Sequence, residues 1–153
     1  MALCDLKLVY DPVIRRCDYA FNGTDIELDF TPVTPVLIAL GCERRARPDD
    51  ELPDAAGDFY APSQINPRKG WPGDAFDPKG WQVGSRLWLL QRRKQDEITR
   101  RLGETATGEA LESFAAEHQL AVSVLVRWVQ RNFLGIKVTV ANATIDLTQP
   151  IAA

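Results

Sequence analysis

The chain has 153 residues, of which 45% are hydrophobic and 25% are charged, and its net charge at pH 7 is −3. This length suits one domain spanning residues 1–153, and the composition is ordinary for a globular protein. A net negative charge gives no overall attraction to nucleic acid or to an acidic membrane, so neither is expected as a partner.

The sequence shows no targeting or membrane-spanning pattern. No apolar run approaches the roughly 20 residues that a transmembrane helix needs. The first residues also lack the basic stretch followed by an apolar stretch of a secretory signal. Three cysteines without a CxxC spacing indicate reduced, packed thiols of a cytosolic product, with a disulfide between two of them as the alternative. They are Cys4, Cys17 and Cys42.

The first third of the chain predicts short strands. Leu6, Leu8 and Tyr10 alternate with other residues before a turn at Asp11, and Asn22-Gly23 is a second hairpin signal. The expected result is a meander of three antiparallel strands. Residues 34–41 follow as a short apolar run, for which the periodicity does not separate helix from strand. As a helix, this run would be capped by Thr34 and would stop at Gly41.

Regular structure is expected to lapse between residues 42 and 83, where prolines recur every five to ten residues. Three of the four tryptophans nevertheless lie in the Gly/Pro-rich stretch 70–90, "GWPGDAFDPKGWQVGSRLWLL". Residues 49–58 are acidic and residues 86–101 are basic, which suggests a long ordered loop packed back onto a basic helical face. The alternative is that both blocks are solvated surfaces.

A long helix is predicted for residues 95–117, capped by Asp96 and preceded by a short helix capped by Ser85. Gly103 and Gly108 predict a kink or break. The apolar residues at helical spacing are Ile98, Leu102, Ala106, Ala110, Leu111, Phe114 and Ala115.

After Gln119 the apolar period becomes two, and three segments within residues 120–148 read as antiparallel strands. The predicted fold is therefore α+β: an N-terminal strand meander, a long ordered Pro/Gly/Trp-rich loop, and one long helix packed on a C-terminal antiparallel sheet.

Nothing in the sequence supports catalysis, a metal site or a cofactor. His118 is the single histidine and has no cysteine or second histidine near it, and the glycines form no phosphate-binding pattern. The acidic loop offers pairs of carboxylates for glycoside cleavage, but one of them would need a raised pKa to act as an acid.

Three motifs carry a family resemblance: "RRARPDDELPD" at 44–54, "RKGWPGDAF" at 68–76 and "GSRLWLLQRRKQ" at 84–95. With the helix and the β ending that follow, they resemble the Mu-like phage baseplate wedge family across residues 6 to about 141. That family is similar to the lysozyme-like sheath-initiator subunits of contractile tails. Its members usually have Trp-Trp-Gly-Asp where this chain has Trp71-Pro72-Gly73-Asp74.

The resemblance implies a structural subunit of a contractile tail, present in a ring of several copies in the virion baseplate and assembled in the host cytoplasm. The implied partners are the baseplate wedge proteins and the tail sheath protein, and no enzyme activity is expected. The alternatives are a peptidoglycan-cleaving, lysozyme-like enzyme of the tail and a tail assembly factor that leaves the virion.

The resemblance also indicates which residues meet these partners. The wedge-facing candidates are Arg44, Arg45, Trp71, Gly73, Asp74, Arg86 and Trp88. For Trp88 the alternative is core packing, and for Asp74 it is capping of the main chain at Ala75 and Phe76. An unpaired strand edge within 120–148 is expected to accept the extended arm of a sheath subunit, unless the last strand itself covers that edge. The candidates for this strand addition are Val138, Val140, Ile145 and Leu147.

Overall fold

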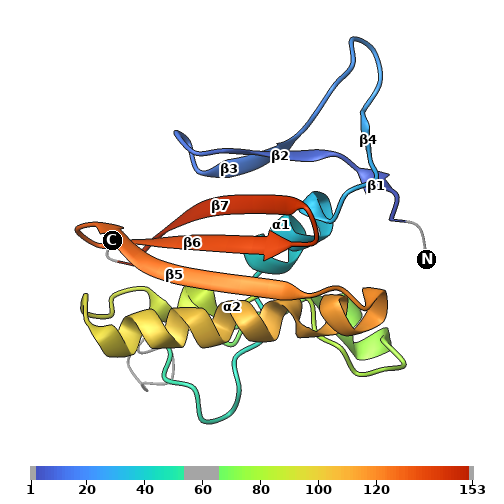
Figure 1. Cartoon of the computed structure of the whole chain (residues 1–153). Coiled ribbons are helices and arrows are strands. Elements are labelled where there is room, and N and C mark those ends of the chain that lie inside the picture. The colour runs from blue at the N-terminus through green and yellow to red at the C-terminus, as the bar shows by residue number, and fades with distance from the viewer. Residues whose placement is uncertain (1–2, 54–65, 152–153) are drawn as a thin grey trace.

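The computed structural model describes residues 3–53 and 66–151, which fold around a three-stranded antiparallel sheet (Figure 1). The strands β5 (Val122–Gln130), β6 (Phe133–Val140) and β7 (Ala143–Pro150) lie in chain order, with β6 in the centre. The helices α1 (Val33–Gly41) and α2 (Glu97–His118) share one core with one face of this sheet. The predicted α+β class is confirmed.

The alternation of side chains across the sheet separates a dry face from a wet one. Buried residues on the helix-facing side include Val126, Ile136, Val138 and Ile145. The opposite face carries the exposed residues Leu125, Arg127, Lys137 and Asp146. An antiparallel sheet with one solvated face is a common solution, and it explains the period of two in the sequence.

Helix α2 begins where the sequence predicts. The Asp96 carboxylate accepts a hydrogen bond from the Thr99 N–H at 2.7 Å, and Gln119 ends the helix in the left-handed conformation. The helix runs without a break through Gly103 and Gly108, and Gly103 lies where it approaches the core side chain of Leu134. The predicted apolar stripe is also only partly buried, since Ile98 is 68% exposed.

Residues 33–41 form a helix, but Thr34 is not its cap. The Thr34 side chain is fully buried, where it donates to the Asp29 carboxylate at 2.8 Å and accepts from the Leu8 N–H at 3.0 Å. Asp29 also accepts from the main-chain N–H groups of Thr31 and Thr34. A carboxylate from the preceding segment thus supplies the acceptor that a capping side chain would have supplied.

In the N-terminal arm, residues 5–30, the strands pair in a different order from the predicted meander. Its strands are β1 (Asp5–Leu6), β2 (Leu8–Asp11), β3 (Arg16–Tyr19) and β4 (Leu28–Asp29). β2 pairs with β3 as predicted, but β4 pairs back with β1. The change of partner occurs at Lys7, whose N–H donates to the Glu27 carbonyl while its own carbonyl accepts from the Ala20 N–H. These long-range bonds leave no local pattern in the sequence.

The long loop is largely irregular, as predicted, with short 3-10 turns η1 (Pro72–Phe76) and η2 (Leu87–Leu90) in and after it. Ser85 does not cap η2; its hydroxyl donates to the Leu40 carbonyl at 2.9 Å. Residues 54–65 of the loop lie outside the described residues, so its order there stays a prediction. Cys4, Cys17 and Cys42 are free, and all three are exposed rather than packed.

The two glycines of α2 predict opposite responses to alanine. A Cβ at Gly103 would lie 2.6 Å from Leu134 Cδ2 in the core, whereas a Cβ at Gly108 meets nothing within 4 Å. Gly103→Ala should lower the free energy of unfolding by roughly 1–3 kcal/mol through overpacking. Gly108→Ala should raise it by about 0.5–1 kcal/mol, because alanine favours the helix. Urea unfolding measures both, and equal shifts of the same sign would contradict the close approach at Gly103.

Candidate functional site

Three segments in and directly after the long loop are hydrogen-bonded side by side, and we call them the strap: residues 42–46, 68–70 and 84–88. Ser85 exchanges main-chain hydrogen bonds with Cys42 and Arg44 at 2.9 and 3.0 Å, and the Ala46 N–H donates to the Arg68 carbonyl at 2.9 Å. Gly84 has a φ of +99°, and a Cβ there would lie 2.6 Å from the Cys42 carbonyl oxygen. Only glycine allows this approach, so the strap depends on that position.

Arg86 is the electrostatic centre of the strap. Its side chain is 11% exposed and donates to both oxygens of Asp50, at 3.0 and 3.1 Å, and to the Glu109 carboxylate of α2. Burial alone would raise the pKa of Asp50, but the Arg47 N–H and the Arg86 guanidinium hold that pKa below its ordinary value. One planar guanidinium thereby joins the acidic loop to the long helix.

The predicted pairing of the acidic loop with the basic segment is confirmed at Asp50 with Arg86 and at Glu51 with Arg93, 3.3 Å apart. The third member, Glu109, was not singled out from the sequence. Glu109 lies at a position of the amphipathic helix α2 that the sequence pattern assigns to solvent. Arg86 reaches it only because the loop folds back onto the helix.

Arg44 and Trp88 are engaged within the chain. Arg44 donates to the Glu109 carbonyl at 3.0 Å and to the Gln82 side chain at 3.2 Å, and its own carbonyl accepts from the Trp88 indole N–H at 2.9 Å. Trp88 is 5% exposed, and the Lys69 ammonium lies 4.5 Å from its ring centre. Trp88 is therefore a core-packing residue, which was the alternative to a wedge-facing role. Arg45, in contrast, is exposed on the surface.

The turn at Trp71-Pro72-Gly73-Asp74 presents aromatic side chains on a braced frame. Trp71 is 57% exposed and its ring covers Gly73, where a Cβ would overlap it. Asp74 accepts from the Val83 N–H at 3.0 Å, so it braces the loop rather than the main chain at Ala75 and Phe76. Phe76, which the sequence did not single out, is 86% exposed. Apolar rings held outward on a fixed turn are typical of interface anchors.

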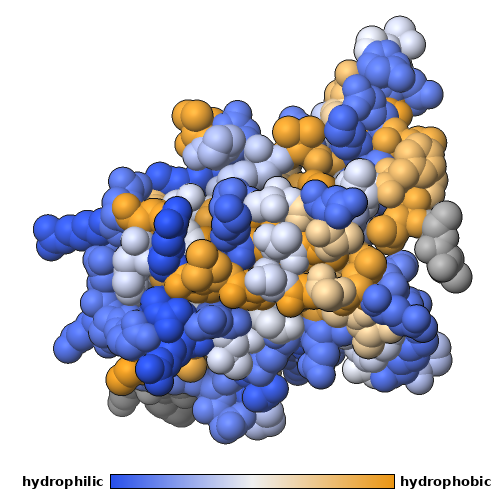
Figure 2. Space-filling model, in the orientation of Figure 1, coloured by the Kyte–Doolittle hydropathy of each residue, from blue (hydrophilic) through white to orange (hydrophobic). Residues whose placement is uncertain are grey.

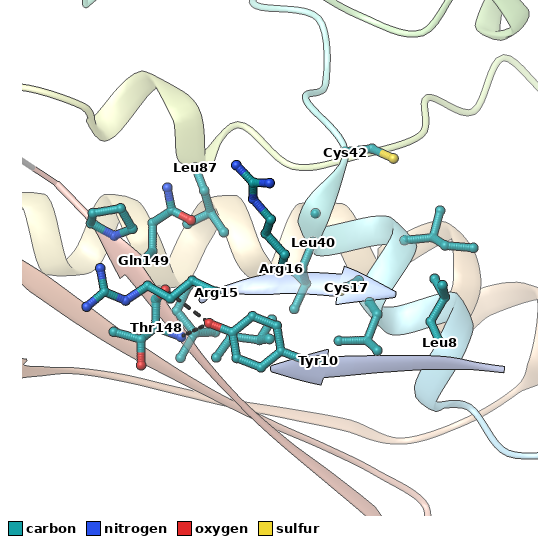
Figure 3. A pocket seen from close by; sticks show the side chains of 16 residues that line it. Leu8, Tyr10, Arg15, Arg16, Cys17, Leu40, Cys42, Leu87, Thr148 and Gln149 are labelled. Atoms are coloured by element: carbon teal, nitrogen blue, oxygen red, sulfur yellow. Dashed lines mark hydrogen bonds between the residues drawn. The ribbon is translucent and has the colours of Figure 1, made fainter. Parts of the chain in front are cut away.

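The outer edge of β7 carries main-chain groups that face away from β6. Thr148 donates its N–H to the Tyr10 hydroxyl, and that hydroxyl donates to the Thr148 carbonyl, both at 3.4 Å (Figure 3). Because both main-chain groups of a strand residue point to the same side, the outward-facing residues of β7 are Thr144, Asp146 and Thr148. The two-residue turn closed by Val140 and Ala143 is consistent with this phase.

This geometry corrects the predicted strand-addition residues. Val138 and Val140 lie on the central strand β6, which pairs on both sides, so their main chain cannot accept a further strand. Ile145 and Leu147 are on the outer strand, but their main-chain groups face β6. The sequence identified the strands and missed their order and phase, which depend on long-range contacts such as that of Tyr10.

A groove of about 590 Å³ runs between the hairpin β2–β3, α1 and β7, with a largely apolar lining (Figure 3). It is bounded by residues that include Leu8, Tyr10, Leu40, Leu87 and Leu147. The other edge strand, β5, is less open, because the Val126 carbonyl accepts from Arg100 of α2 at 3.1 Å.

In the part of the chain that the structure describes, no group of three or more His, Cys, Asp or Glu residues is placed to hold a metal ion. The ring of His118 lies tilted against that of Phe114, with ring centres 4.7 Å apart. Neither described helix combines the length and apolar character needed to cross a bilayer.

Comparison with known proteins decides the family. The model of the family described as phage protein GP46 matches residues 32–146, well over half of the chain. The chain belongs to the phage protein GP46 family. Baseplate protein gp46 of Escherichia phage Mu is 38% identical over 110 residues, which cover 72% of this chain and 67% of that protein. No solved structure gives a significant match. The resemblance to a Mu-like baseplate family is thereby confirmed.

The matched residues of this GP46-family chain contain α1, the strap, α2 and most of the sheet, while the N-terminal arm precedes them. The strap and the partly buried ion pairs of Arg86 therefore lie within the region that the family model matches.

Arg86→Met should lower the free energy of unfolding by roughly 1–3 kcal/mol at pH 7, because Asp50 would lose its guanidinium partner and Glu109 would keep only the more exposed Arg47, 3.2 Å away. The matched control is Arg101→Met, whose side chain is 74% exposed beside Glu97 and which should change the value by less than about 0.5 kcal/mol. Urea unfolding measures both.

The effect of Arg86→Met should also depend on pH. Since the folded-state pKa of Asp50 lies below its unfolded value, the pair stabilises fully above about pH 4–5 and loses this contribution as pH falls through the folded pKa. The difference between wild type and Arg86→Met should therefore shrink toward pH 3. Similar losses for Arg86→Met and Arg101→Met would contradict the central place of Arg86.

Proposed function

We propose that this chain is a structural subunit of the baseplate of a contractile phage tail, located in the virion and assembled in the host cytoplasm. The observation that carries the proposal is the 38% identity to a phage Mu protein named as a baseplate protein, spread over about two thirds of both chains. Several copies arranged in a ring fit the rotational symmetry expected of a tail.

The braced turn at residues 71–76 is proposed to dock on the baseplate wedge proteins. Trp71 and Phe76 offer large apolar area on a turn that is already ordered, so little conformational entropy is lost on binding. Exposed Arg45 lies against Gly70 next to this turn. Gly73, Asp74, Arg44, Arg86 and Trp88 act as positioning residues that hold the turn.

The outer edge of β7 is proposed to template the first sheath ring by strand addition. Thr144 and Asp146 offer up to four outward main-chain groups, each worth on the order of 1 kcal/mol net in a hydrogen bond. That sum is small for a lasting contact. The apolar groove of about 590 Å³ beside β7 supplies the additional burial that an incoming arm needs.

An enzymatic role finds no support in the carboxylates of the acidic loop and of the turn at residues 71–76. A glycosidase acid needs a raised pKa, and the pKa of Asp50 is lowered by its partners. Asp74 is used as an acceptor for a loop N–H. We therefore propose a structural role rather than the lysozyme-like alternative, and a virion component rather than an assembly factor that is released.

The sheath-templating proposal is tested by Asp146→Pro. Proline at this position removes an outward N–H and adds a ring on the free edge, while the ladder to β6 stays intact, so the subunit should still fold. Tails reconstituted with it should retain baseplates that carry the subunit, but sheath assembly on them should fall by roughly tenfold or more. Electron microscopy of purified particles counts sheathed and unsheathed tails.

The matched control is Asp146→Ala, which removes the same carboxylate and keeps the N–H; it should sheathe normally. Normal sheathing with Asp146→Pro would reject strand addition on β7, and absence of the wild-type chain from purified tails would reject the baseplate role itself.

A further inference from the structure

The N-terminal arm exposes an unusual share of the molecule's apolar surface. Within the described residues, eight of the fifteen exposed large hydrophobic side chains lie in residues 6–30. Figure 2 shows a continuous hydrophobic patch over β1 and β4, beside the N-terminus. A cluster of this kind on a chain with an otherwise ordinary surface marks an interaction site.

The centre of this surface is formed by Leu6, Leu28 and Phe30, which we call the arm patch. Leu6 and Leu28 are directly opposite each other on β1 and β4, so their side chains share one face. They are 43% and 53% exposed, and Phe30 is 65% exposed. A hollow of about 320 Å³ adjoins them and is lined by residues that include Leu8, Leu28, Phe30 and Val33. It has room for one apolar anchor side chain.

The fold holds this patch in place. The buried pair of Asp29 and Thr34 fixes the end of β4 on α1, and Lys7 forms a 2.6 Å ion pair with Glu27 where the arm segments cross. The opposite side of β4, which carries Asp29, is buried, so the face with Leu28 points outward. The apolar side chains are thus exposed because the strand pairing and polar contacts of the arm hold them outward, and not because the arm is frayed.

The charge of the arm indicates what covers the patch. Residues 1–31 hold six carboxylates and three cations, and the remaining residues hold fifteen of each, so the whole net charge of −3 lies on the arm. Within the described residues, the carboxylates of Asp5, Asp18 and Asp25 accept a hydrogen bond from the N–H of the next residue and form no ion pair there. Two arms of this chain facing each other would place like charges together, which disfavours a second copy.

We propose that the arm patch docks on a different protein of the tail, one that presents an apolar anchor side chain inside a rim of Lys and Arg. The proposal rests on the baseplate role and adds a surface separate from the turn at residues 71–76 and from the β7 edge. Apolar burial supplies the affinity, and the acidic arm selects a basic rim and speeds encounter with it.

The test compares Leu28→Gln/Phe30→Gln with the matched control Leu125→Gln, whose side chain is 52% exposed on the wet face of the sheet. All these side chains are at least half exposed, so the isolated chains should unfold like wild type. The amount of each variant in purified tails, relative to tube protein, is measured by quantitative mass spectrometry. The double variant should be reduced roughly tenfold or more, and the control should match wild type.

A photoreactive phenylalanine analogue at position 30 then identifies the neighbour in assembled tails. Cross-links to a basic-rimmed apolar surface of another tail protein support the proposal. Cross-links to a second copy of this chain, or normal incorporation of the double variant, overturn it. Absence of the wild-type chain from tails would instead overturn the baseplate role, so the two failures are distinguishable.

Discussion

The guanidinium of Arg86 ties together parts of the chain that have little regular structure of their own. On one side it grips Asp50 of the acidic loop, and on the other Glu109 of the long helix. A cation that is only 11% exposed is stabilising only while its carboxylates are in place, so both carboxylate segments are fixed relative to η2. Arg44 joins the buried Trp88 to the same part of the long helix, since it donates to the Glu109 carbonyl and its own carbonyl accepts from the Trp88 indole.

This arrangement explains why tryptophan, with its large apolar area, occurs in a Gly- and Pro-rich segment. Trp88 packs in the core and donates to the strap, whereas Trp71 lies outside on a turn that the strap keeps rigid. One tryptophan stabilises the loop and the other is available to a partner. The glycines permit the close approaches, most clearly at Gly84, where the next segment leaves no space for a side chain.

Local patterns in the sequence were sufficient for the elements whose stability is local. Helix α2 has its Asp96 cap and its period, and the last three strands show clean alternation with short turns. Complementary charge also indicated that the acidic loop folds back on the basic segment. For the helix and the strands the signal lies within a few residues of the structure that it predicts, whereas the charge pairs join residues 36 and 42 apart in the sequence.

The remaining features depend on tertiary contacts that leave no pattern in the sequence. Glu109 as a partner of Arg86, Asp29 as the acceptor for Thr34, and Tyr10 on the edge of β7 are separated from their partners by 23, 5 and 138 residues. Val138 lies on the central strand β6, and the main-chain groups of Ile145 face β6. The hydrophobic alternation in the sequence therefore identified buried side chains, and not main-chain groups that are free to pair. Docking residues were harder still, because Trp71 and Trp88 lie in the same Gly/Pro-rich stretch, and only the folded structure shows that Trp71 is 57% exposed and Trp88 is 5% exposed.

A cryo-EM map of the assembled tail base tests the central claim most directly, namely that the strap holds a rigid turn whose aromatic side chains meet another baseplate protein. The expected map shows Arg86 still joined to Asp50 and Glu109, with Trp71 and Phe76 buried against a neighbouring protein. A map in which this chain is present with both aromatic side chains in solvent, or with the strap rearranged, would contradict the claim.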